Sequence, residues 1–236
     1  MRNLSGIESD LFRAYREIES AVQLRSQYVN LGELGMEFHQ RPTLFAGLPG
    51  WEDVILSQDL CQNTPRVTEI KAYWSTVAPL PELQGEFCVG DVFTDLIQPP
   101  PEPLWEGSPP EDRAFFSSIR VVDDAPVIGT GHWAGIRILP HTDPLEMWFY
   151  DPQLVRIPEA EKPYFRIDLT YPEYLRNLAI TKGALGWQYL FTETVPLNSP
   201  GLRETMVRLQ DMMEILPTLF PGWDYGPISE RLEARL

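Results

Sequence analysis

The chain has 236 residues, 43% of them hydrophobic and 22% charged, which is enough apolar material for one sizeable core. Its 34 acidic and 19 basic residues give a formal net charge of −15, so the surface is expected to repel nucleic acid and anionic membranes and to attract basic partners. The apolar stretches fall far short of the roughly 20 residues that span a bilayer, and the N-terminus turns acidic before a secretory signal can form, which together predict a cytoplasmic protein.

The first predicted element is an amphipathic helix over residues 6–29. Ser5 and Glu8 have the spacing of a capping box, in which each side chain binds a backbone N–H of the other residue. The apolar residues that recur at helical spacing behind this cap are Ile7, Leu11, Tyr15, Ile18 and Val22. The helix is expected to stop near Gly32.

A second helix is predicted over residues 68–78, after a stretch at 35–65 in which glycine and proline indicate mostly loop. Its expected buried stripe consists of Ile70, Tyr73, Trp74 and Val77. A third, short helix is predicted over 92–97. Residues 98–112 hold six prolines and are predicted to be an extended connector without helix or strand, or else a ligand for an aromatic groove.

Three strands are predicted in the middle of the chain, over residues 116–122, 132–139 and 145–150. Each is apolar or alternates apolar with polar residues, and short turns rich in Asp, Gly and Pro separate them. Connections this short favour an antiparallel meander, because parallel strands need a crossover helix. A fourth short strand is predicted over 153–157.

Three helices are predicted after the strands. Thr170 and Glu173 have the spacing of a helix start, and the helix that follows is expected to end near Gly183. Residues 199–200, Ser-Pro, open the next helix, and residues 227–236 form a short amphipathic one. Helices, then a sheet, then helices indicate an α+β fold.

The expected architecture is an antiparallel sheet meander covered by helices, with an N-terminal helix and a C-terminal helical segment. We expect one α+β domain over residues 1–236. Within it, 98–112 is the proline-rich connector and 184–236 a C-terminal helical extension.

Two further groups of residues have structural interpretations. Trp187, Tyr189 and Phe191 are expected to pack in the core, and any of them that is exposed would be a natural interface anchor. Cys61 and Cys88 are too few for a disulfide framework or a four-ligand zinc site, and we expect both to be buried free thiols.

No catalytic or cofactor motif was found in the sequence, and no cofactor is predicted. One set of residues nevertheless offers an enzymatic alternative, a small metal-dependent hydrolase. It consists of His132 and His141, which flank a predicted strand, with Asp143 and Glu146 just after it. Their spacing matches no standard zinc pattern, so we expect no metal site.

The order of elements resembles the SUKH superfamily over residues 65–182. The segment at 168–175, Asp-Leu-Thr-Tyr-Pro-Glu-Tyr-Leu, opens a helix after the meander as in that family, and Trp133, Trp148 and Tyr174 fall at apolar positions of its pattern. The proline-rich insert departs from the family's compact pattern. The resemblance implies an immunity-type protein that neutralises a toxin.

The resulting hypothesis is a non-enzymatic binding module that occludes a basic protein partner with an acidic surface and a few exposed aromatic side chains. A structural or assembly subunit is a further alternative. The residues predicted to contact the partner are Trp105, Asp123, Asp124, Trp133 and Glu146.

Overall fold

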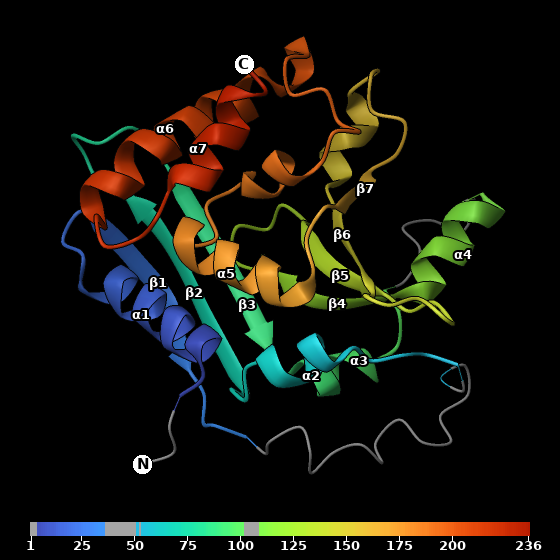
Figure 1. Ribbon diagram of the computed structural model, residues 1–236. Coiled ribbons are helices and arrows are strands. Elements are labelled where there is room, and N and C mark those ends of the chain that lie inside the picture. The colour runs from blue at the N-terminus through green and yellow to red at the C-terminus, as the bar shows by residue number, and fades with distance from the viewer. Residues whose placement is uncertain (1–3, 36–50, 52, 102–108) are drawn as a thin grey trace.

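The computed structural model describes residues 4–35, 51, 53–101 and 109–236. Over this part of the chain, seven strands form one antiparallel sheet and lie in sequence order, as a continuous meander (Figure 1). The strands are β1 (Leu24–Leu31), β2 (Glu69–Thr76), β3 (Gln84–Gly90), β4 (Ile119–Asp124), β5 (Trp133–Arg137), β6 (Glu146–Tyr150) and β7 (Tyr164–Ile167). The predicted α+β class and the antiparallel meander are confirmed. Trp105 lies outside the described residues.

Helices gather mainly over one face of the sheet, where Figure 1 shows α1, α5, α6 and α7, while α4 stands apart at the β4–β7 end. The α-helices are α1 (Gly6–Ser20), α2 (Gln58–Asn63), α3 (Val92–Leu96), α4 (Pro110–Ser118), α5 (Tyr171–Thr181), α6 (Arg203–Leu219) and α7 (Gly226–Glu233). Short 3-10 helices are η2 (Pro152–Arg156), η3 (Trp187–Phe191) and η4 (Pro200–Leu202). The N-terminal helix and the C-terminal helical segment are thus present as predicted.

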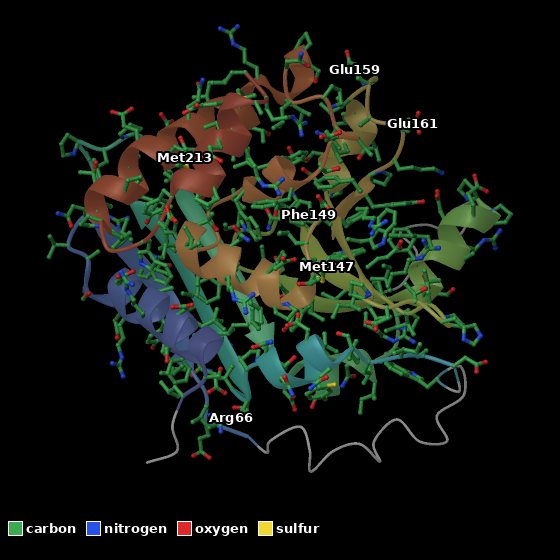
Figure 2. All side chains as sticks on the ribbon, viewed as in Figure 1. Arg66, Met147, Phe149, Glu159, Glu161 and Met213 are labelled. Carbon is green, nitrogen blue, oxygen red and sulfur yellow. The ribbon has the colours of Figure 1, made fainter. Side chains whose placement is uncertain are left out.

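The strands from β4 to β7 separate two hydrophobic clusters, because successive side chains of a strand point to opposite faces. On β6, Met147 and Phe149 pack into the main core beneath α5 (Figure 2), whereas Tyr150 belongs to a smaller cluster on the other face and Trp148 packs against it. Helix α4 completes the smaller cluster with Phe115 and Phe116. Burying each of these large side chains contributes about 1.5–3 kcal/mol.

The first helix is shorter than its periodicity predicts. The capping box forms as expected, with Ser5 and Glu8 each bound to the other's backbone, but α1 ends at Ser20. The chain then turns into β1, which pairs with β2 along its length. Val22, the last residue of the predicted apolar stripe, is 85% exposed, so the helical pattern ended one turn earlier than its spacing indicated.

The helix predicted over residues 68–78 is wrong, because this segment is strand β2. Its buried residues are Ile70, Ala72 and Trp74, which alternate with exposed or half-buried positions. Ile70 and Trp74 are four residues apart, a spacing that lies on one face both of a helix and of a strand. Tyr73, which only the helical pattern placed inside, points to the other side of the sheet. Strand β3, which pairs with β2, was not predicted.

Two boundaries near proline also differ from the prediction. The connector predicted at 98–112 ends in helix, because Pro110 occupies the first position of α4, where its missing N–H and fixed φ suit a helix start. Residues up to 118 stay helical, so the strand predicted from 116 begins at Ile119. The strand predicted at 153–157 is wrong as well: Pro152 and the cap Asp151 start η2 there, and β7 takes the place beside β6.

The C-terminal segment shares the main hydrophobic cluster with α1 and the sheet. Trp187, Tyr189 and Phe191 are all under 5% exposed, as the core interpretation predicted. Helix α5 begins at a complete capping box and ends at Thr181, with Lys182 as its C-cap, close to the predicted stop. Among the described residues, no helix combines the length and the apolar character that crossing a membrane requires.

Candidate functional site

The sheet is nearly divided between β3 and β4. These strands share a single residue pair, Val89 with Asp123, whereas β4 and β5 share five pairs. The reason is that another segment occupies the free edge of β3. The N–H of Glu86 donates to the carbonyl of Gly183 at 3.0 Å, in the turn that follows α5. Beyond the one bridge, β4 therefore diverges from β3.

The same segment makes a second backbone contact with β3. The N–H of Leu185 donates to the carbonyl of Gln84 at 3.0 Å, and Gly85 forms an isolated antiparallel bridge with Ala184. Gly183 has a φ of +68°, and a side chain here would collide with the backbone of Glu86 at 2.6 Å. A glycine is required at this position for both reasons.

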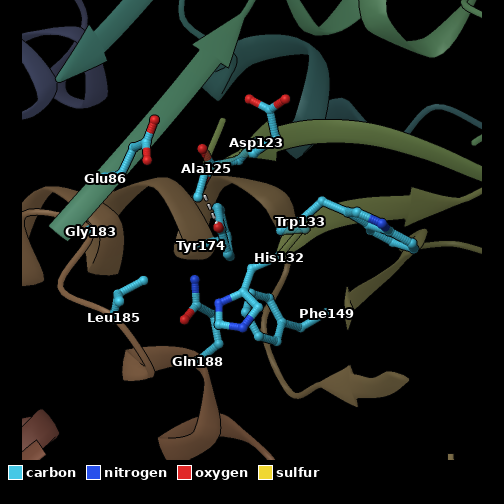
Figure 3. Close-up of a pocket in the computed structure, with 12 residues that line it drawn as sticks. Glu86, Asp123, Ala125, His132, Trp133, Phe149, Tyr174, Gly183, Leu185 and Gln188 are labelled. Atoms are coloured by element: carbon cyan, nitrogen blue, oxygen red, sulfur yellow. Dashed lines mark hydrogen bonds between the residues drawn. The ribbon is translucent and has the colours of Figure 1, made fainter. Parts of the chain in front are cut away.

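Two hollows lie on either side of the single bridge, and Asp123 and Asp124 line both. The first is an open groove of about 410 Å³ toward the end of β3, lined by Thr68, Glu69, Cys88, Gly90, Asp91, Thr94, Asp95, Val121, Val122, Asp123 and Asp124. The second is a small pocket of about 20 Å³ (Figure 3), lined by Glu86, Asp123, Asp124, Ala125, His132, Trp133, Ala134, Phe149, Tyr174, Gly183, Leu185 and Gln188.

Asp123 is the buried centre of this region. Its Oδ1 accepts the N–H of Cys88 at 2.8 Å and its Oδ2 accepts the hydroxyl of Tyr174 at 2.6 Å. Burial, followed by the charges of Asp124 and Glu86, raises the pKa of Asp123 to about 7 against the opposing effect of the two hydrogen bonds. With 5% exposure, Asp123 ties β3, β4 and α5 together, so the sequence hypothesis that it lies on a surface facing a partner requires correction.

The groove is electrostatically negative. Asp95 shows this most clearly, because burial and then the charges of Asp91 and Asp124 raise its pKa to about 7. Burial and then Asp124 and Asp123 raise the pKa of the Cys88 thiol to about 12, so this cysteine is a protonated, inert thiol at neutral pH. Asp124 itself is exposed.

One wall of the pocket rests on a buried carboxylate that the sequence reasoning missed. Asp151 accepts the hydroxyl of Tyr189 at 2.7 Å and lies 3.1 Å from Nε2 of His132. Burial raises the pKa of Asp151, but the hydrogen bond and charge of His132, then Tyr189 and the Gln153 N–H, bring it below its usual range. The sequence did contain a pattern that could have indicated this residue, because Asp151 and Pro152 directly follow a predicted strand and are typical of the start of a helical turn.

The residues of the metal-hydrolase alternative do not meet. His141 lies at an exposed turn, 4.0 Å from Asp53, while His132 faces Asp151. Glu146 pairs with Arg137 at 3.5 Å. Within residues 4–35, 51, 53–101 and 109–236, no three His, Cys, Asp or Glu side chains are grouped to hold a metal ion.

Two of the predicted partner-contacting residues lie on the α4 side of the sheet. Trp133 stacks on Tyr150 with ring centroids 4.9 Å apart, and Glu146 accepts the indole N–H of Trp148 at 3.0 Å. Both residues are half-buried. The structure thus places Asp124 in the groove but the side chains of Trp133 and Glu146 beside the smaller aromatic cluster.

Comparison with known proteins gives no match to a protein-family model, a curated protein or a solved structure. The functional argument therefore depends on the geometry of the groove and the pocket.

Proposed function

We propose that this protein is a non-enzymatic binding module that holds a basic protein partner in the groove beside β3 and β4. One observation carries the proposal: the groove is lined by five carboxylates and, among its described lining residues, by no Lys, Arg or His. The carboxylates are Glu69, Asp91, Asp95, Asp123 and Asp124. Of these carboxylates, Glu69 pairs with Lys71, whose Nζ lies 3.1 Å away.

Electrostatics favours a cationic occupant. The carboxylates also repel one another: burial first, and then the charges of Asp91 and Asp124, raise the pKa of Asp95 to about 7. A Lys or Arg side chain entering the groove relieves this repulsion, and the net charge of −15 accelerates the encounter with a basic protein. The same field disfavours nucleic acid as a partner.

Two further proposals accompany this one. The resemblance of residues 65–182 to the SUKH superfamily favours an immunity-type role, in which the basic partner is a toxin and the groove occludes it. The free cysteines Cys61 and Cys88 favour a reducing compartment such as the cytoplasm.

The test is capture of partners from the native host on immobilised protein at low and high salt, with mass spectrometry of what is retained. The wild type is compared with the double variant Asp95→Asn/Asp124→Asn, which removes two groove charges without changing side-chain size. The control is Glu159→Gln/Glu161→Gln, which removes two exposed charges from the loop between η2 and β7 (Figure 2).

A basic protein that the wild type and the control retain at low salt, and that the groove variant loses, supports the proposal. We expect the affinity of the groove variant for it to fall at least about fivefold at low salt, because exposed charges act mainly through screened, long-range attraction. Retention of the same basic protein by the groove variant and its loss from the control would contradict the proposed location.

A further inference from the structure

The pocket on the other side of the bridge contains polar atoms without partners. Gln188 is 8% exposed, and its Oε1 has no hydrogen-bond partner among the described residues. Neither Nδ1 nor Nε2 of His132 has a hydrogen-bond partner there, although Nε2 lies 3.1 Å from Asp151. Both residues line the pocket, and Figure 3 shows their side chains, with that of Tyr174, turned toward the same space. A buried polar atom without a partner costs about 1–3 kcal/mol, so the pair indicates a ligand.

The contacts of Gln188 make its free Oε1 a hydrogen-bond acceptor. The hydroxyl of Tyr174 gives its proton to Asp123, so in its contact with Gln188 it accepts from Nε2, which leaves Oε1 free. Nε2 of His132 lies 3.1 Å from the carboxylate of Asp151, on the far side of the ring from Nδ1. The ligand must supply hydrogen-bond donors.

The charge and the size of the pocket restrict the chemical class of the donor group further. Three carboxylates line the pocket, those of Glu86, Asp123 and Asp124, so the donor group is cationic. The space of about 20 Å³ holds one water-sized group. An ammonium fits this volume, and a planar guanidinium does not. Ala125 and Leu185 supply apolar walls that suit the methylene chain behind an ammonium.

We propose that this pocket binds a primary ammonium group on an alkyl chain, and that in the cell this group is a lysine side chain of the basic partner. The inference rests on the proposed function, and it adds a specificity that the open groove lacks. The groove attracts any cation, whereas the pocket selects lysine over arginine.

The test uses NMR titration of the isotopically labelled full-length chain. The probes are an oligolysine, an oligoarginine of equal charge, and 1,4-diaminobutane as a free amine. We expect oligolysine to shift the side-chain amide signals of Gln188 and the ring signals of His132, and oligoarginine to shift only residues that line the groove alone, such as Thr94. Binding constants come from calorimetry with the same probes.

Two variants check the assignment. Gln188→Met keeps the side-chain volume but removes Oε1, and we expect it to weaken oligolysine binding about five- to tenfold and to leave oligoarginine binding unchanged. Ala125→Leu fills the pocket and retains Gln188, so it should have the same effect. A thermal melt of each variant verifies that it is folded.

The outcomes separate the two proposals. If neither oligocation binds the wild type, the proposed function fails. If both bind equally, Gln188 does not shift and Gln188→Met has no effect, the groove proposal stands and the lysine pocket is overturned. If diaminobutane shifts Gln188 and oligolysine does not, the pocket is an ammonium site for a free amine, and its assignment to a partner's lysine is overturned.

Discussion

The phenol of Tyr174 donates a 2.6 Å hydrogen bond to Oδ2 of Asp123, and this bond joins helix α5 to the divided part of the sheet. Both residues are buried, so no solvent replaces the bond when it is lost. We expect Tyr174→Phe to lower the free energy of unfolding by about 1–3 kcal/mol, measured by urea denaturation. Tyr171→Phe is the matched control, because the buried hydroxyl of Tyr171 has no hydrogen-bond partner in the described part of the chain. Equal losses in the two variants would contradict this account.

Glu8 should account for part of the acid sensitivity of the protein. It caps α1 and binds Arg66 through a 2.8 Å contact with Nε and a 2.7 Å contact with Nη2. Burial raises the pKa of Glu8, but the hydrogen bonds from Arg66 and Ser5 outweigh it and lower the pKa to about 2. A depressed folded-state pKa stabilises the protein above the ordinary pKa of 4.5, and this stabilisation is lost as the pH falls toward 2.

We therefore expect Glu8→Gln to cost about 3 kcal/mol at pH 7, because it leaves the Arg66 guanidinium without its carboxylate. The variant should also show a shallower decline in stability between pH 5 and 2 than the wild type. Glu19→Gln, an exposed change on the same helix, serves as the control. Parallel acid-unfolding curves for the wild type and Glu8→Gln would refute the prediction.

Lys182 should make the stability of the protein rise with pH in the alkaline range as well. Its side chain is fully buried, 3.0 Å from Glu17 and 4.1 Å above the ring of Trp223. Burial lowers its pKa to about 8 from 10.5, although Glu17 acts in the other direction. Between these values the unfolded chain binds the proton more often than the folded one, so stability rises with pH. The free energy of unfolding of the wild type, relative to that of Lys182→Met, should rise by up to about 3 kcal/mol between pH 8 and 10.5, as measured by urea denaturation. A constant difference between the two proteins would rule this out.

Binding of the basic partner should strengthen as the pH rises from 6 to 8. Asp95, with a pKa near 7 caused by burial, Asp91 and Asp124, is mostly protonated at pH 6 and mostly ionised at pH 8. A cationic partner binds the ionised form more tightly, so the dissociation constant for oligolysine should fall over this range. Asp95→Asn should make the pH profile shallower and leave the part due to Asp123, whose pKa burial also raises to about 7, while Glu159→Gln should preserve the wild-type profile. A wild-type affinity that weakens with rising pH would exclude the mechanism.

The sequence predicted those elements whose signals are local. The capping boxes at Ser5 and Thr170 and the alternating strands of the middle region depend only on residues close together in the sequence, and the structure contains them. The errors arise where one spacing fits two structures, as for Ile70 and Trp74, or where pairing with a distant strand decides the conformation, as for β1.

The candidate site was only partly predictable for a related reason. Asp124 drew attention as a turn residue after a strand, but the pocket also needs Gly183 and Gln188, which follow α5. These residues are brought together by the pairing of the segment around Gly183 with β3, and no local sequence pattern predicts that pairing. The residues that line the pocket are far apart in the sequence, and none of them stands in a local motif that would indicate a binding site.

The single bridge between Val89 and Asp123 divides the sheet into two halves that share one residue pair. Each half forms from strands that are neighbours in sequence, while the joint is completed by residues that arrive after α5 has been built. Contacts of such long range form late in folding and open early, because they close the largest loops. Backbone amides at the joint should therefore exchange with solvent before those at the centre of either half, so that the region proposed to hold the partner is also the part of the fold most able to adjust its width.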